Sequence, residues 1–269
     1  MPVFVSKFGG TSLANGERFL NVSDIVHAHP ARRVVVVSAP GKSEAGDQKV
    51  TDLLSFAFEN KDEKAFLRVR ERFCEISSYL KCSIDEELLM AEEAVLHGND
   101  RARALSMGEY LSAKLFSLLS GYHFTDAKDV IFFKDAKVDE DRTQSALKNT
   151  FRRHKFLVIP GFYGADDRGR YVLFPRGGGD ITGAVTAFFL GADEYENWTD
   201  VDGISDRDPN IYKDAKVLSH LNYDQAERIL AAGAAVLHRD CIAWARRSGI
   251  KIRVRSTFHP LSLGTLITP

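Results

Sequence analysis

The sequence predicts an α/β protein in which helices cover a layered, largely parallel sheet. Short runs of β-branched and aromatic residues alternate with amphipathic stretches along the chain, and this alternation favours parallel strands joined by helical crossovers. Glycines follow the ends of several of these runs, as is typical of strand-to-helix turns. The 269 residues carry no Pro/Ser-rich linker, so we expect a single domain over residues 1–269.

The expected elements follow from where each apolar run begins and ends. In the first part they are a strand at Pro2–Phe8, a helix at Glu17–Ala28, a strand at Arg33–Ser38, a mostly helical region from Thr51 to Leu119 interrupted at His97–Asn99, strands at Tyr122–Asp126 and Ile131–Phe133, a helix to about Arg153 capped by Asp139 or Asp141, and a strand at Phe156–Pro160. In the second they are a hairpin with its turn at Ala165–Gly169 and its return strand at Tyr171–Phe174, a helix at Ile181–Leu190, a strand at Glu194–Thr199, helices at Tyr223–Ala232 and Arg239–Ser248, and strands at Ile252–Val254 and Thr265–Ile267.

The composition excludes several classes of function. Lys and Arg number 36 against 37 Asp and Glu, a net charge of -1, which argues against a binder of nucleic acid or of anionic membranes driven by overall charge. No apolar run approaches the roughly 18 residues of a membrane span, and the N-terminus lacks the pattern of a signal peptide. The three cysteines show no CxxC spacing. We therefore expect a cytoplasmic protein with inert thiols.

Two glycine-rich turns are the strongest candidates for a ligand site. Lys7–Ser12 follows the first strand and Arg176–Asp180 precedes a helix, and glycines at such places let backbone N–H groups approach an anion. Neither turn matches the Walker A pattern, and Thr182 stands where a third Rossmann glycine would be. Lys7 adds a positive charge suited to a polyphosphate, and Arg176 and Asp180 flank the second turn. From the local pattern alone, Lys7 is equally well interpreted as a solvated lysine, and Asp180 as a helix N-cap.

Three further segments carry weaker signals. Trp198–Gly203 ends a strand in polar groups that suit a nucleotide but also suit an ordinary turn. Ser106–Glu109 places a glycine inside an expected helix, which costs about 1 kcal/mol and invites a reason such as close approach of a ligand. Gly233–His238 lies between two helices, where His238 is better interpreted as structural than as a base.

Taken in order, these segments resemble the aspartate kinase branch of the amino acid kinase family. The motifs that carry the resemblance are KFGGTS at Lys7–Ser12, VVVVSAPGK at Val34–Lys42, SMGE at Ser106–Glu109, PGFYG at Pro160–Gly164, RGGGD at Arg176–Asp180, WTDVDGI at Trp198–Ile204, GAAVLH at Gly233–His238 and RVRSTF at Arg253–Phe258. The resemblance implies a three-layer αβα sandwich with a mainly parallel central sheet and two lobes. The N-terminal lobe, about 1–175, would hold the amino acid and the C-terminal lobe, about 176–269, the nucleotide.

The resemblance also implies an activity and a set of site residues. The chain would transfer the γ-phosphoryl group of ATP to the β-carboxylate of L-aspartate, which starts lysine, threonine and methionine biosynthesis. Catalysis would fall to Lys7 and Asp180. Aspartate would be held by Thr51, Glu109, Arg176 and Gly179. The nucleotide would be held by Lys7, Gly9, Gly10, Thr11, Thr199, Asp200, Ser205, Arg207 and Asp208. Mg²⁺ would be carried by ATP, without a direct protein ligand.

Departures from the family pattern keep two alternatives open. Gly179 stands where a serine is common, Ser205 and Asn210 replace a tyrosine and an arginine, and Ala235 replaces a lysine. The loss of a hydroxyl at Gly179 motivates a kinase for a different carboxylate or phosphonate substrate. The loss of a lysine at Ala235 motivates a catalytically weak, nucleotide-binding subunit.

The chain stops after Gly264–Ile267, where family members commonly continue into ACT regulatory domains. We therefore expect insensitivity to lysine and threonine unless a separate regulatory chain binds. A homodimer is the expected assembly, with no nucleic-acid or membrane partner.

Overall fold

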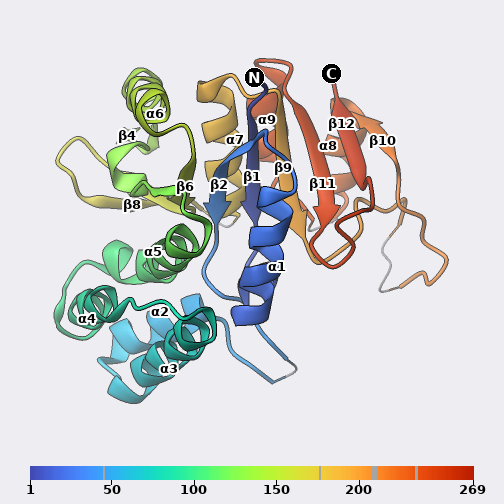
Figure 1. Cartoon of the computed structure of the whole chain (residues 1–269). Helices are drawn as coiled ribbons and strands as arrows, with labels where there is room; N and C mark the ends of the chain where they lie inside the picture. The colour runs from blue at the N-terminus through green and yellow to red at the C-terminus, as the bar shows by residue number, and fades with distance from the viewer. Residues whose placement is uncertain (45, 176, 208–210, 234–235) are drawn as a thin grey trace.

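The central feature of the computed structural model is a sheet with helices in front of it and behind it (Figure 1). The structure describes residues 1–44, 46–175, 177–207, 211–233 and 236–269. The strands are β1 Phe4–Phe8, β2 Arg32–Val37, β3 His123–Phe124, β4 Phe133–Lys134, β5 Lys137–Val138, β6 Leu157–Pro160, β7 Tyr163–Ala165, β8 Tyr171–Leu173, β9 Glu194–Thr199, β10 His220–Asn222, β11 Lys251–Ser256 and β12 Thr265–Thr268. The helices are α1 Gly16–His27, α2 Val50–Asn60, α3 Glu63–Leu80, α4 Asp85–Glu92, α5 Arg101–Ser120, α6 Glu140–His154, α7 Gly178–Leu190, α8 Tyr223–Ala231 and α9 Asp240–Arg246.

The strand order explains where a ligand can bind. Within the described residues the main sheet has the order β10-β12-β11-β9-β1-β2-β6-β3, and every adjacent pair in it is parallel except β11 with β12. The chain passes from β1 to β2 on one side and returns later through α7 to β9 on the other. The carboxyl end of β1 is therefore a point where the strand order reverses, and such points form ligand crevices in α/β sheets.

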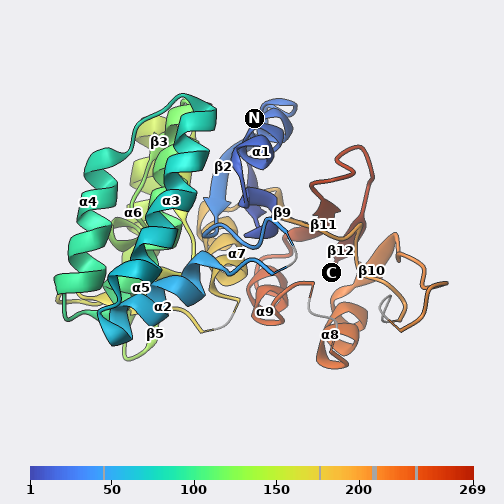
Figure 2. The ribbon, with the colours of Figure 1, turned by 90° about the horizontal axis from the view of Figure 1, so that it is seen from below.

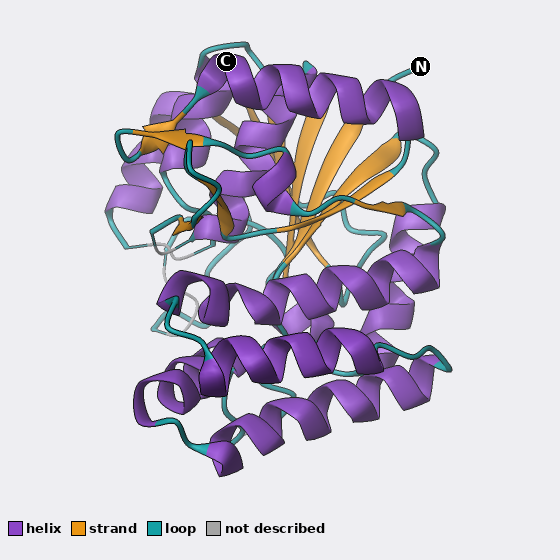
Figure 3. Cartoon of the chain, turned by 90° about the vertical axis from the view of Figure 1, so that its left-hand side faces the viewer, coloured by secondary structure: helices purple, strands orange, loops and turns teal. Residues whose placement is uncertain are grey.

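The two faces of the sheet are covered by different helices, which confirms the three-layer αβα arrangement. On β2, Val35 and Val37 pack with α1 and α5, while Val34 and Val36 pack with α7. This alternation follows from the two-residue period of a strand, and the valines are buried on both sides because each face carries helices. Figure 3 shows helices on both sides of the strands. Figure 1 shows α5 between the sheet and α2, α3 and α4, and Figure 2 shows α2 to α5 gathered at the end of the molecule opposite α8 and β10.

Most of the expected elements are confirmed, with informative differences. The region after Thr51 forms α2 to α5, and the interruption at His97–Asn99 is real, with Gly98 in extended backbone at φ -72° rather than in a left-handed turn. Asp139 accepts a hydrogen bond from the Arg142 amide and caps α6. Strand β10 was not predicted from the sequence. Leu221 is its only buried residue, and one buried residue gives no alternation of apolar and polar positions.

Helix α7 begins at Gly178, ahead of the expected Ile181. Its N-cap position is Gly177, with a left-handed φ of 78°, and glycines are poor helix formers in sequence-based reasoning. The earlier start places Gly179 and Asp180 inside the first helical turn. Asp180 is therefore free of the N-cap role that the sequence left open. Among the helices of the described ranges, none is long and apolar enough to cross a membrane.

Candidate active site

An ion pair at the end of the central strand is the core of the site. Lys7, in β1, places its Nζ 2.7 Å from Oδ1 of Asp180, and the two side chains are only 11% and 14% exposed. The other oxygen of Asp180, Oδ2, accepts a hydrogen bond of 3.0 Å from the backbone N–H of His238. Both carboxylate oxygens are thus committed, so Asp180 is fixed and holds the Lys7 ammonium at the carboxyl edge of the sheet.

Glycines surround this ion pair because backbone segments approach each other closely. A Cβ atom built on Gly10 would lie 2.7 Å from the carbonyl oxygen of Ala39, and one built on Gly41 would lie 2.7 Å from the Gly10 carbonyl carbon. The Gly41 N–H also donates to the Gly10 oxygen at 2.8 Å. Only glycine fits such distances without movement of the backbone. The first glycine turn is therefore packed against the segment that follows β2, and Gly41 is a site residue that sequence reasoning missed.

Gly179 lies beside both the ion pair and a hydroxyl. A Cβ atom on Gly179 would be 3.0 Å from Oγ of Ser38 and 3.4 Å from Cε of Lys7. Ser38 directly follows β2 and was also missed, although the SAPG segment that contains it was part of the resemblance. Because Ser38 approaches so closely, a hydroxyl remains next to position 179 even though the residue there is glycine.

Glu109 is the second ionisable feature of the site. It lies in α5, is 6% exposed, and its Oε2 has no hydrogen-bond partner among the described residues. Burial raises the pKa of its carboxyl to about 8, although a hydrogen bond from the Ala39 backbone lowers it in part. A buried carboxyl with one open oxygen is suited to a cationic ligand group.

The glycine next to Glu109 has a packing reason. A Cβ atom on Gly108 would meet Ala39 Cβ at 2.7 Å and Val50 Cγ1 at 3.2 Å. The close approach expected at this glycine is therefore made by the chain itself, through the segment after β2 and the start of α2. Thr51, the next residue of α2, is half-buried and belongs to the same helix start that contacts α5.

The polar end of β9 joins the first glycine turn. The Gly9 N–H donates to the carbonyl oxygen of Trp198 at 3.1 Å, and the Thr199 carbonyl accepts from the N–H of Thr257 at 2.9 Å. The Thr199 hydroxyl donates to Oδ1 of Asp200 at 3.1 Å. Thr11 enters a short 3-10 helix at Thr11–Leu13. These residues lie along the carboxyl edges of β1 and β9.

The remaining predicted residues fall into two groups. Arg176 and Asp208 lie outside the described residues, as do Asn210 and Ala235. Ser205 forms an isolated antiparallel β-bridge with Val217. Arg207 is exposed, and its Nε lies 3.8 Å from Oδ1 of Asp206 and its Nη1 3.7 Å from Oδ2 of Asp214. The described contacts of these two residues therefore stay within their own loop and do not join the Lys7–Asp180 group.

A buried ion network lies in the strands that carry the site. Glu196 of β9 accepts hydrogen bonds from Arg32 Nε at 2.8 Å, from Ser6 Oγ at 2.7 Å and from Trp198 Nε1 at 3.0 Å. Burial works against its charge, but Arg32 and the other donors hold the pKa of this carboxyl below its ordinary value. The sequence contained a signal for this network, because Arg32 and Glu196 are charged residues inside apolar strands. That signal did not show which residues would pair.

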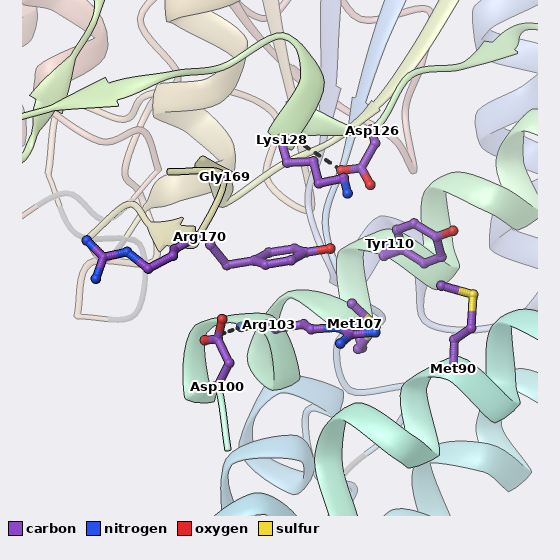
Figure 4. A pocket seen from close by; sticks show the side chains of 10 residues that line it. Met90, Asp100, Arg103, Met107, Tyr110, Asp126, Lys128, Gly169 and Arg170 are labelled. Atoms are coloured by element: carbon purple, nitrogen blue, oxygen red, sulfur yellow. Dashed lines mark hydrogen bonds between the residues drawn. The ribbon is translucent and has the colours of Figure 1, made fainter. Parts of the chain in front are cut away.

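A separate cavity of about 540 Å³ lies between α4, α5 and the β7–β8 hairpin (Figure 4). Helix α5 lines it with Arg103, Met107 and Tyr110. Glu109 and Tyr110 are consecutive, but only Tyr110 lines this cavity, because neighbouring helix residues point about 100° apart. None of the residues lining this cavity belongs to the Lys7–Asp180 group.

The model of the amino acid kinase family matches residues 2–256. The chain belongs to the amino acid kinase family. The chain is 33% identical to aspartokinase 3 of Bacillus subtilis, over 98% of the chain and 63% of that relative.

Solved structures of aspartate kinases and aspartokinases are also similar to this chain. Aspartate kinase from Clostridium acetobutylicum has a TM-score of 0.92 at 35% identity, covering 100% of this chain and 63% of that one. Aspartokinase III of E. coli, solved in complex with aspartate and ADP, has a TM-score of 0.87 at 28% identity, covering 99% of this chain and 64% of that one. The chain thus spans less than two thirds of the length of these relatives.

Proposed function

We propose that the chain is an aspartate kinase, which transfers the γ-phosphoryl group of ATP to the β-carboxylate of L-aspartate. The observation that carries the proposal is the pairing of two sites at one sheet edge. The Lys7–Asp180 ion pair among glycine turns suits a polyphosphate, and the buried, half-partnered Glu109 suits the ammonium of an amino acid. The relatives named above as aspartokinases and aspartate kinases support the same choice.

Aspartate would be held by opposite charges at its α-carbon. Glu109 would pair with the α-ammonium, which would favour the ionised form of this buried carboxyl. Arg176 would grip the α-carboxylate with its planar guanidinium. Thr51 would donate a hydrogen bond to the substrate, and Gly179 would leave room for the substrate beside Lys7.

The nucleotide would lie along the carboxyl edges of β1 and β9. The backbone N–H groups of Gly10 and Thr11 and the ammonium of Lys7 would face the phosphates. The other nucleotide contacts are assigned, by the resemblance, to Gly9, Thr199, Asp200, Ser205, Arg207 and Asp208. This assignment keeps the division into an amino-acid lobe of about 1–175 and a nucleotide lobe of about 176–269.

Magnesium would be carried by the nucleotide. No group of three His, Cys, Asp or Glu side chains that could hold a metal occurs in the described part of the chain, and Asp180 is already committed to Lys7 and His238. This donor set fits an ion held by phosphate oxygens and water rather than by a protein cage. When bound, the ion neutralises phosphate charge.

The chemical step needs alignment rather than a base. An oxygen of the β-carboxylate is already a nucleophile; it forms a bond to the γ-phosphorus while the bond from that phosphorus to the bridging oxygen breaks, and ADP leaves with the electron pair. No proton moves. Lys7 would offset the charge on the transferring group, and Asp180 would keep the Lys7 ammonium in place through the transfer.

The proposal is tested by coupled ADP release from ATP with aspartate, glutamate and N-acetylglutamate as acceptors. Turnover with aspartate that exceeds the other two is expected. Equal or better turnover with another acid would favour the alternative carboxylate kinase, and ATP binding without transfer would favour the nucleotide-binding subunit. The Ser38 hydroxyl beside Gly179 weakens the reason for the first alternative. The proposal includes a homodimer in the cytoplasm, which light scattering and fractionation would test.

A further inference from the structure

We infer that Arg72, on α3, is a positioning residue. It holds the segment between β2 and α2, and through that segment it fixes the positions of the first glycine turn and of the start of α2. This role rests on the proposed function for its kinetic consequences. The hydrogen bonds of Arg72 within the described residues go to Gly41 and Asp47, so its influence on the proposed site passes through the backbone of that segment.

The guanidinium of Arg72 joins two places in the segment. Its Nη1 donates to the carbonyl oxygen of Gly41 at 3.2 Å, and its Nη2 contacts Oδ1 of Asp47 at 2.6 Å. The side chains of Arg72 and Asp47 are 17% and 11% exposed. A planar guanidinium can make two such bonds in fixed directions, so one side chain fixes both ends of the segment relative to α3.

The carboxylate of Asp47 accepts hydrogen bonds from two other residues of the segment. Oδ2 accepts from the Ser43 N–H at 2.8 Å and from the Ser43 hydroxyl at 3.0 Å, and Oδ1 accepts from the Gln48 N–H at 2.8 Å. Burial opposes ionisation, yet the Ser43 amide and Arg72 hold the pKa of this carboxyl well below its usual range. The carboxylate therefore stays charged throughout the neutral pH range. The chain reaches Thr51 four residues later.

Gly41 connects this anchor to the proposed nucleotide site. Its N–H donates to the Gly10 carbonyl at 2.8 Å, and neither glycine has space for a Cβ atom. Arg72, Gly41 and Gly10 therefore form one continuous chain of hydrogen bonds from α3 to the turn after β1. If Arg72 is lost, the Gly41 contact loses its support from α3, and displacement by about 1 Å is enough to reduce turnover strongly.

The test compares Arg72→Gln with Arg70→Gln as a matched control. Arg70 lies on the same helix and pairs with Glu92 at 2.9 Å, so its variant loses an ion pair of the same helix, a more exposed one, and leaves the hydrogen bonds of the segment in place. We expect KM for aspartate and for ATP to rise in Arg72→Gln, with kcat/KM lower by about tenfold or more, whereas Arg70→Gln should keep wild-type values. Arg72→Lys should recover part of the loss, because it keeps the charge but not the fork.

A second measurement is independent of turnover. Lys42 and Lys49 are exposed on the segment, so limited trypsin digestion should cut there faster in Arg72→Gln than in Arg70→Gln, and calorimetry should show weaker ATP binding. If the wild-type protein does not phosphorylate aspartate, the proposed function fails, but these two readouts still decide the role of Arg72. KM values, ATP affinity and cleavage rates equal to those of Arg70→Gln would overturn it.

Discussion

The substitution Glu109→Gln should stabilise the unliganded protein at neutral pH and above, and abolish its use of aspartate. Glu109 is almost fully buried and the pKa of its carboxyl is raised from 4.5 to about 8, chiefly by burial. In the folded state it therefore keeps a proton that the unfolded chain releases. Between these two pKa values the folded state binds more protons, so stability must fall as pH rises.

The size of the effect follows from the shift. At 1.36 kcal/mol for each pKa unit, a rise from 4.5 to about 8 corresponds to about 5 kcal/mol of lost stability above pH 8 and about 3 kcal/mol at pH 7. Glutamine has nearly the same shape and does not titrate. The free energy of unfolding of Glu109→Gln should therefore exceed that of the wild type by nothing below pH 4.5 and by several kcal/mol at pH 8.

Urea unfolding of both proteins between pH 5 and 8.5, without ligand, measures this advantage. Calorimetry adds a direct test: aspartate binding at pH 7 should release close to one proton from the wild-type protein, because the ammonium favours the ionised carboxylate. Titrations in buffers of different ionisation enthalpy count that proton. Parallel stability curves for the two proteins, or aspartate binding with no proton released, would refute the reasoning about Glu109.

Three other substitutions test the remaining parts of the site. Lys7→Ala should lower kcat by about 10²-fold or more while ATP binding weakens modestly, because the charge acts mainly on the transition state; wild-type kcat would remove Lys7 from the mechanism. Gly179→Ala should lower activity, since its Cβ would lie 3.0 Å from Ser38 Oγ, and Ser38→Ala added to it should restore part of the loss; the idea fails if the double variant is no better in the same assay. Arg32→Met should reduce the free energy of unfolding by about 3–5 kcal/mol, because it leaves Glu196 buried without its main partner; a loss below about 1 kcal/mol in urea titrations would contradict this.

Local patterns were sufficient for most strands of the sheet, but they left both members of the ion pair open. Lys7 was equally well interpreted as a solvated lysine and Asp180 as a helix N-cap, and only the resemblance to the aspartate kinase branch gave the two a shared role. The extent of β9 was predicted as Glu194–Thr199, its actual bounds. By contrast, β10 could not be predicted, because a three-residue edge strand with one buried side chain carries no periodic signal.

The sequence by itself determined the order of the motifs, the alternation of strands and helices, and the charged residues available to a site. Only the tertiary structure decided which of them act together. Lys7 and Asp180 are 173 positions apart, yet parallel strand order brings their side chains within 2.7 Å. Likewise, only the tertiary structure places Ser38 beside Gly179 and links Arg72 through Gly41 to the first glycine turn, because these contacts depend on distances in space, which residue spacing along the chain does not encode.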